Sequence, residues 1–218
     1  MSADQKSAFL AGEGDAWFER NAAHLAGNPA DVCLQAIARL PLAPKRILEI
    51  GASNGHRLAL LKERYGAAVS GVEPSAKAVA DGKARFPGVD LQVGAADSLP
   101  FADGAFDLVI FGFCLYLVDP RHHFRAIAEA DRVLASPGAL AIFDFIEPIP
   151  YYNRYAHLDG LRSHKTEWSR FFLASPSYRL VQRVADLKGE APLARNNLSG
   201  VDILLKDVET AYPQNPFA

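Results

Sequence analysis

The chain has 218 residues, half of them hydrophobic, and a net charge of −2 at neutral pH, which suits one α/β domain with a substantial core. The weak charge and the lack of a long basic run disfavour a nucleic-acid-binding protein. Because the sequence has no stretch of about 18 uninterrupted apolar residues, we expect no membrane span. Cys33 and Cys114 are isolated and lack metal-site spacing, so we expect a cytoplasmic protein with reduced thiols and no metal.

The predicted elements alternate between helices and strands along most of the chain. Residues of about 15–40 predict two helices, interrupted near 27–29. Strands that alternate with helices imply right-handed βαβ units and a mainly parallel sheet. No helix-length pattern separates the last two strands, which therefore predict an antiparallel hairpin. The seven strands are predicted at 46–50, 68–72, 89–93, 106–112, 138–145, 178–187 and 201–207, with further helices at 56–65, 75–85 and 121–135.

The stretch from Ile47 to Gly55 is the most informative part of the sequence. An apolar strand ends in a glycine-containing turn, and a helical pattern follows, so backbone N–H groups and a helix N-terminus can approach a polar ligand. The stretch matches a dinucleotide site poorly, because Ser53 and His56 stand where two glycines of G-x-G-x-x-G belong. It also reads as G-x-S-x-G, the nucleophile elbow of a hydrolase, but that elbow needs an earlier strand for its oxyanion-hole loop.

A third interpretation rests on Glu49, Gly51 and Gly55, which form the pattern E-x-G-x-x-x-G. This pattern resembles motif I of the class I S-adenosylmethionine (SAM) dependent methyltransferases. Glu73 ends the next strand, 22 positions after Gly51, an offset that suits a carboxylate accepting from both hydroxyls of a ribose. Further along, the runs G-A-A-D-S-L-P-F and D-G-A-F-D-L-V-I resemble the adenine-binding loop of that family and the strand after it.

The resemblance covers roughly residues 45–145 and implies a Rossmann-like, doubly wound, mainly parallel seven-stranded sheet with a C-terminal antiparallel hairpin. It implies a SAM-binding methyltransferase domain at 45–218 and an N-terminal helical lid at 1–44, in which Arg20 meets the methionine carboxylate of SAM. Asp97 would accept a hydrogen bond from the adenine N6 amino group. The cofactor-binding residues implied are Arg20, Glu49, Gly51, Ala52, Ser53, Gly55, Glu73, Pro74, Ala96, Asp97, Ser98, Gly112 and Phe113.

The implied reaction transfers the methyl group of SAM to a small-molecule acceptor, with an oxygen or nitrogen nucleophile favoured, and yields S-adenosylhomocysteine. Such a reaction needs the nucleophile in line behind the methyl group at about 3 Å, with water excluded and no metal required. Three alternatives stay open at this point. They are a relative that binds SAM without catalysis, an NAD-dependent oxidoreductase and a G-x-S-x-G hydrolase.

Residues of about 147–175 predict a substrate-covering insertion after the fifth strand. Interleaved aromatic and cationic residues there suit an anionic or aromatic small molecule, although an amphipathic helix over the sheet edge is the alternative. Tyr152, Tyr155 and His157 are the predicted acceptor-site residues. His157 is the predicted base, because an imidazole titrates near neutral pH. We interpret His122 and His123 as surface residues, since neighbours on a helix point apart.

Overall fold

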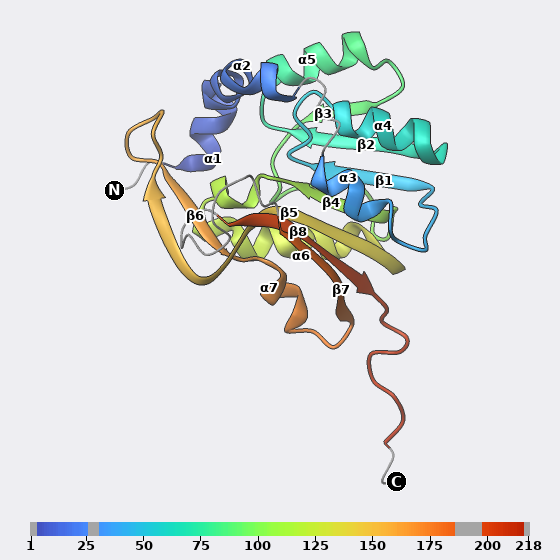
Figure 1. Cartoon of the computed structure of the whole chain (residues 1–218). Coiled ribbons are helices and arrows are strands. Elements are labelled where there is room, and N and C mark those ends of the chain that lie inside the picture. The colour runs from blue at the N-terminus through green and yellow to red at the C-terminus, as the bar shows by residue number, and fades with distance from the viewer. Residues whose placement is uncertain (1–3, 26–30, 186–197, 216–218) are drawn as a thin grey trace.

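One mixed β-sheet runs through the molecule (Figure 1). The computed structural model describes residues 4–25, 31–185 and 198–215. The sheet has eight strands, seven of them in the order β3-β2-β1-β4-β5-β8-β7, with β6 paired to β5 outside this path. The bounds are β1 (Arg46–Ile50), β2 (Ala68–Glu73), β3 (Asp90–Val93), β4 (Phe106–Gly112), β5 (Leu134–Arg154), β6 (Arg162–Glu167), β7 (Tyr178–Ala185) and β8 (Ser199–Lys206).

The strand directions confirm the predicted fold class. In the sheet order β3-β2-β1-β4-β5, each strand pairs in parallel with its neighbour, whereas β8 runs antiparallel to both β5 and β7. The C-terminal antiparallel pair therefore closes one side of a parallel sheet, as the sequence predicts. The predicted strand at 178–187 is described as far as Ala185, and the rest of it lies outside the described residues.

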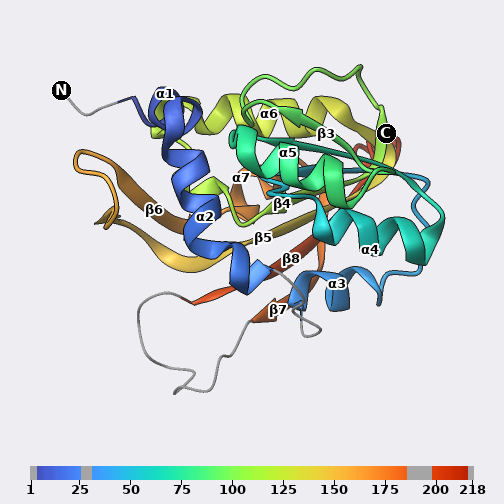
Figure 2. The same ribbon diagram turned by 90° about the horizontal axis from the view of Figure 1, so that it is seen from above.

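Helices cover both faces of the sheet (Figures 1 and 2). Successive residues of a strand point to opposite faces, so Ile47 packs in one apolar cluster and Leu48 in another. The first cluster includes residues of α3, α4 and α5, and the second includes residues of α6 and α7. The helices are α1 (Gln5–Ala8), η1 (Phe9–Glu13), α2 (Gly14–Leu25), α3 (Val32–Ile37), α4 (His56–Tyr65), α5 (Ala76–Arg85), η2 (Leu115–Leu117), η3 (Pro120–His122), α6 (His123–Val133) and α7 (Ser169–Leu173).

The segment after the fifth predicted strand forms a β-hairpin arm, defined here as residues 146–167. Strand β5 continues to Arg154, and β6 returns antiparallel to it, with Tyr152 opposite His164. The alternative of a helical excursion is therefore wrong for this segment. Pro148 and Pro150 explain the difference, because proline disrupts a helix interior. Gly160 lies between the two strands with φ +85° and supports the turn.

The N-terminal helices lie beside this arm and over one end of the sheet (Figures 1 and 2). The side chain of Gln5 contacts both neighbours: its amide donates to Leu117 O at 2.8 Å and its oxygen accepts from Arg162 N at 3.0 Å. Helices α2 and α3 correspond to the two predicted in residues 15–40, and the predicted interruption near 27–29 lies outside the described residues. The N-terminal segment is thus held against both the sheet edge and the arm.

Candidate functional site

A cavity of about 470 Å³ opens at the carboxyl ends of β1, β2 and β4. Open α/β sheets bind ligands at this edge, because strand ends, loops and helix N-termini meet there. The N-terminal helices cover it with side chains of α1, η1 and α2. Polar and charged lining residues include Gln5, Lys6, Asn21, Asp31, Glu49, Asn54, His56, Arg57, Glu73, Asp97, Asp119 and His122, and aromatic ones are Phe9, Trp17, Phe113, Tyr116 and Phe143.

The turn between β1 and α4 forms part of the cavity wall and has an unusual backbone. Gly51 has φ +75°, and a Cβ there would lie 2.5 Å from the Cβ of Cys114. Gly55 has φ +74° and caps α4. Ser53 adopts φ +49°, and its hydroxyl has no hydrogen-bond partner in the part of the chain that the structure describes. A hydrolase nucleophile would need a base beside it, so this serine does not have the geometry of a nucleophile elbow.

Glu73 stands at the end of β2 and supports the turn. Its Oε2 accepts from Ser53 N at 2.9 Å and its Oε1 accepts from Ser75 N at 3.0 Å. Burial raises the pKa of Glu73 to about 7, although the two backbone bonds favour the ionised form. Each oxygen keeps a second lone pair, so the ionised carboxylate can accept two further hydrogen bonds from the cavity side.

Glu49 ends β1 with one carboxylate oxygen unpaired. Its side chain is only 1% exposed, and its Oε1 forms an ion pair with Arg57. Arg57 also holds Asp31 at 2.8 Å and lies 5.4 Å from the ring centroid of Phe143. Among the described residues Glu49 Oε2 has no hydrogen-bond partner. Burial raises the pKa of Glu49, against the charge of Arg57, so a cationic donor in the cavity would stabilise its ionised form.

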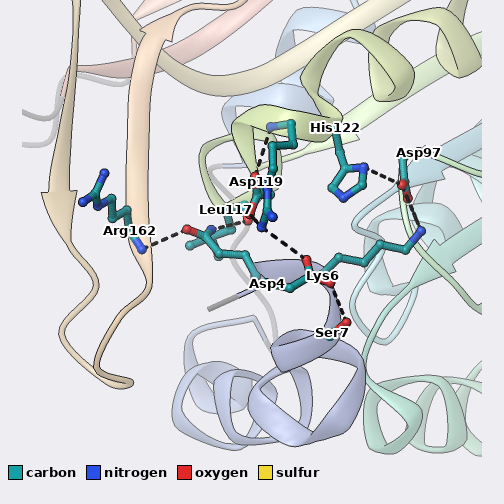
Figure 3. Close-up of polar contacts among 10 residues, drawn as sticks. Asp4, Lys6, Ser7, Asp97, Leu117, Asp119, His122 and Arg162 are labelled. Atoms are coloured by element: carbon teal, nitrogen blue, oxygen red, sulfur yellow. Dashed lines mark hydrogen bonds and ion pairs between the residues drawn. The ribbon is translucent and has the colours of Figure 1, made fainter. Parts of the chain in front are cut away.

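Asp97 follows β3 and receives contacts from two distant segments (Figure 3). Lys6 Nζ lies 2.8 Å from its Oδ1 and 2.9 Å from its Oδ2. His122 Nδ1 lies 3.1 Å from Oδ2. The Asp97 side chain is 5% exposed. The interpretation of His122 and His123 as surface residues is wrong, because His122 lines the cavity and burial lowers the pKa of His123 to about 4.

Aromatic side chains line the end of the cavity beyond β4. Phe113 has φ +60°, a strained conformation for a residue with a Cβ, and its ring lies 5.1 Å from Tyr116 and 5.0 Å from Phe143 between centroids. Trp17 of α2 donates a hydrogen bond to the Tyr116 hydroxyl. Burial raises the pKa of Tyr116, so this phenol stays neutral at physiological pH.

Most of the predicted cofactor-binding residues meet at this cavity. The other three predicted residues do not line it: Gly55 caps α4, Ser98 is exposed, and Arg20 is paired elsewhere. The guanidinium of Arg20 forms an ion pair with Glu13 and donates to the Tyr155 hydroxyl at 3.1 Å. The predicted residues that line the cavity are Glu49, Gly51, Ala52, Ser53, Glu73, Pro74, Ala96, Asp97, Gly112 and Phe113.

The three residues predicted for the acceptor site do not line the cavity. Tyr155 is buried, and its hydroxyl donates to Glu13 at 2.7 Å. Tyr152 is exposed and lies beside the Arg162 guanidinium, 4.3 Å from the ring centroid. His157 is exposed in the turn of the arm. The antiparallel pairing of the arm places Tyr152 opposite His164, and Tyr155 and His157 lie beyond the end of β5; a single sequence does not contain this pairing.

Sequence reasoning missed several lining residues. Arg57 stands two residues after Gly55, in the first turn of α4, a position from which a helix can return a side chain to the strand end. Asp31 and Phe143 come from two other elements, and only the fold brings them to Arg57. Lys6 lies 91 positions from Asp97 and carries no local signal.

The chain is similar in sequence and fold to known proteins. The profile of a methyltransferase domain family matches residues 48–142, which contain the β1 turn, Glu73 and Asp97. This stretch of the chain is therefore similar to a methyltransferase domain. The chain is 40% identical over 116 residues to demethylmenaquinone methyltransferase of Thermus thermophilus, covering 50% of this chain and 51% of that protein. It is 33% identical over 160 residues to the uncharacterized methyltransferase YcgJ of Bacillus subtilis, covering 65% and 60%.

A solved structure extends the likeness of the fold to nearly the whole domain. The chain superposes on 1,6-didemethyltoxoflavin-N1-methyltransferase of Burkholderia thailandensis, solved with 1,6-didemethyltoxoflavin and S-adenosylhomocysteine, with a TM-score of 0.70. The identity is 17%, and the superposition covers 95% of this chain and 92% of that one, so it shows the fold alone. By sequence, the chain spans about half to three fifths of the length of the first two relatives.

Two features of the described part of the chain bear on other functions. None of its helices is long and apolar enough to cross a bilayer. In the same ranges, 4–25, 31–185 and 198–215, no group of three or more His, Cys, Asp or Glu side chains is arranged to hold a metal ion.

Proposed function

We propose that the chain binds SAM in the cavity and transfers its methyl group to a planar aromatic small molecule. One observation carries the proposal: three carboxylates, of Glu49, Glu73 and Asp97, lie along one cavity at the carboxyl edge of the sheet. SAM offers hydrogen-bond donors at three separated points, namely its ammonium group, its ribose hydroxyls and its adenine amino group. Each of the three carboxylates can therefore accept hydrogen bonds from one of the three donor groups of SAM.

The unpaired Oε2 of Glu49 indicates that the cavity can accept the ammonium group of SAM. Leaving a buried carboxylate oxygen without a partner costs about 1–3 kcal/mol, and an ammonium donor would remove that penalty. Gly51 lets the turn pack closely on the loop after β4, because a Cβ at this residue would lie 2.5 Å from the Cys114 Cβ. In this proposal Glu49 binds the ammonium group, Glu73 the ribose diol and Asp97 the adenine amino group.

The charge of the cavity favours SAM over NAD. SAM brings a sulfonium and an ammonium group against one carboxylate, whereas NAD brings an anionic pyrophosphate. Anions are disfavoured beside uncompensated carboxylates. The acidic lining residues are Asp31, Glu49, Glu73, Asp97 and Asp119, and the lysine and arginine residues are Lys6 and Arg57.

The aromatic end of the cavity supports the acceptor class. Trp17, Phe113 and Phe143 present ring faces and edges that would stack on a planar ring and exclude water. The cationic residues of the arm, which suggested an anionic acceptor, do not line the cavity. We therefore propose an aromatic acceptor and no longer an anionic one. The name of the Thermus relative includes demethylmenaquinone, and the Burkholderia structure contains 1,6-didemethyltoxoflavin. Neither name fixes the acceptor of this chain.

The chemistry then depends mainly on positioning. When bound, SAM supplies an electrophilic methyl group on its sulfonium. The residues of the chain hold the cofactor against the β1 turn, hold the acceptor ring between aromatic side chains, and exclude water from both. We no longer propose His157 as a base, because its side chain is exposed in the turn of the arm. An acceptor that is already nucleophilic at neutral pH meets these conditions.

Calorimetry tests the cofactor, and a labelled-methyl assay tests the transfer. We expect micromolar dissociation constants for SAM and S-adenosylhomocysteine, about −8 kcal/mol, and no binding of NAD. Transfer of labelled methyl from SAM should occur to planar aromatic acceptors and not to aliphatic ones of similar size. Binding of NAD without SAM would overturn the proposal. SAM binding with no transfer to any acceptor would favour the alternative of a SAM-binding relative without catalysis.

A further inference from the structure

Lys6 contributes a donor beside the carboxylate that we assign to the adenine amino group (Figure 3). Its ammonium nitrogen lies within 2.9 Å of both Asp97 oxygens, and both residues line the cavity. The Lys6 side chain is 33% exposed, so it reaches the carboxylate from the rim of the cavity. The ion pair therefore presents a hydrogen-bond acceptor and a donor side by side toward the ligand.

We propose that Lys6 is a specificity-determining residue that donates a hydrogen bond to a ring nitrogen of the adenine, beside the amino group bound by Asp97. Adenine displays this combination on its edges: the amino group is a donor, and N1 and N7, which flank it, are acceptors. An asparagine or glutamine amide reads N6 and N7 in the same way, with one acceptor and one donor. The Asp97–Lys6 pair has that donor–acceptor arrangement.

The surrounding contacts hold this pair in place. Gln5, the preceding residue, is fixed by its bonds to Leu117 O and Arg162 N, so the backbone of α1 is positioned at Lys6. His122 Nδ1 lies 3.1 Å from Asp97 Oδ2 but makes no hydrogen bond within the described part of the chain. An ammonium group carries three N–H donors, two of which suffice for the two Asp97 oxygens. The third donor is sufficient for one ligand nitrogen.

The inference rests on the proposed function, because it takes Asp97 as the acceptor for the adenine amino group. The proposed role of Lys6 in reading the adenine base also differs from a role in holding the N-terminal helices closed over the cavity. A closure role would strengthen binding of any adenosine ligand equally. A base-reading role depends on one ring nitrogen of the ligand, and this difference defines the experiment.

The test measures dissociation constants of S-adenosylhomocysteine and its 1-deaza and 7-deaza analogues by calorimetry, for the unmodified chain and for Lys6→Met. For the unmodified chain, one analogue should bind at least about tenfold more weakly, since it lacks a hydrogen bond to a charged group. In Lys6→Met that penalty should vanish, with S-adenosylhomocysteine weakened to the level of the analogue. Lys6→Arg keeps a donor and should retain part of the penalty.

Lys77→Met is the matched control. Lys77 pairs with Glu19 of α2, so this variant also removes an ion pair between the N-terminal helices and the rest of the domain, but Lys77 does not line the cavity. It should keep the full deaza penalty. Equal weakening of all three ligands in Lys6→Met, tighter binding of all three, or no deaza penalty in the unmodified chain would each overturn the inference alone. Failure of the unmodified chain to bind S-adenosylhomocysteine would overturn the proposed function and the inference together.

Discussion

The two ends of the cavity are built in different ways. At the cofactor end, the buried carboxylate of Glu73 is fixed by backbone N–H groups that follow the ends of two neighbouring strands. At the acceptor end, the Phe113 ring after β4 packs on Tyr116 of η2 and Phe143 of β5, and Trp17 of α2 donates a hydrogen bond to Tyr116. The first end recognises charge and hydrogen-bond donors in fixed positions. The second recognises flat apolar shape, which tolerates a wider range of ligands.

Gly51→Ala should cause the largest loss, at the cofactor end. The new Cβ would lie 2.5 Å from Cys114 Cβ at φ +75°. Overpacking costs about 1–3 kcal/mol, and the left-handed backbone adds about 1–2 kcal/mol. We expect the Tm to fall by roughly 5–15 °C in thermal melts and SAM binding to be lost in calorimetry.

Gly66→Ala is the control for that change. Gly66 also has a positive φ, +64°, but a Cβ there would meet no atom within 4 Å. It should cost only about 1–2 kcal/mol and leave SAM affinity unchanged. Equal destabilisation by the two variants would show that backbone strain, and not the close packing of the cavity wall, is the reason for Gly51.

Glu73→Ala should weaken SAM by about 2–3 kcal/mol, because hydrogen bonds to a charged group are lost. It also leaves the N–H groups of Ser53 and Ser75 unpaired, so the free energy of unfolding should fall by about 1–3 kcal/mol. Calorimetry and chemical denaturation measure the two effects. Glu63→Ala, on an exposed position of α4, should change neither. An unchanged SAM affinity in Glu73→Ala would remove the carboxylate from the ribose site.

The pH dependence of binding should come from the cofactor end. Because burial raises the pKa of Glu73 to about 7, the fraction of ionised carboxylate falls to about one tenth at pH 6. Affinity for S-adenosylhomocysteine should therefore decrease up to tenfold between pH 8 and pH 6, and Glu73→Gln should remove this trend. The free energy of unfolding should follow the opposite pH trend. The native state binds the Glu73 proton more tightly than the unfolded state, so the contribution of Glu73 to stability decreases as pH rises from about 5 to 7. A flat binding profile would contradict the assignment.

Trp17→Ala should have the smallest effect, at the acceptor end. Loss of one aromatic contact is worth about 1 kcal/mol, so the KM for an aromatic acceptor should rise roughly fivefold. The affinity for S-adenosylhomocysteine should change little, because the charged contacts lie at the other end. Trp17→Phe keeps an aromatic ring and should have a smaller effect. If Trp17→Ala weakens the binding of S-adenosylhomocysteine and of the acceptor equally, the two ends of the cavity do not bind their ligands independently.

The same contrast explains what the sequence predicts. Gly51, Glu73 and Asp97 follow consecutive parallel strands, and that topology brings the carboxyl ends of those strands to one edge, so position in sequence implies position in space. Phe143 and Tyr116 come from elements whose contacts depend on packing. His157 shows the limit: the residue type suited a base, but its place in the turn of the arm exposes it to solvent. Lys6 reaches Asp97 across 91 positions, a separation at which no local pattern is informative.

The Glu13–Arg20–Tyr155 contact joins the N-terminal helices to the arm, and Gln5 joins them a second time through Arg162. The N-terminal helices, which cover the cavity, are therefore cross-linked to the arm by buried and partly buried hydrogen bonds. An opening wide enough to release a nucleoside must either carry the arm with it or break these bonds. We expect cofactor exchange and acceptor exchange to share a single gating step, which would make the rate of product release sensitive to Tyr155→Phe.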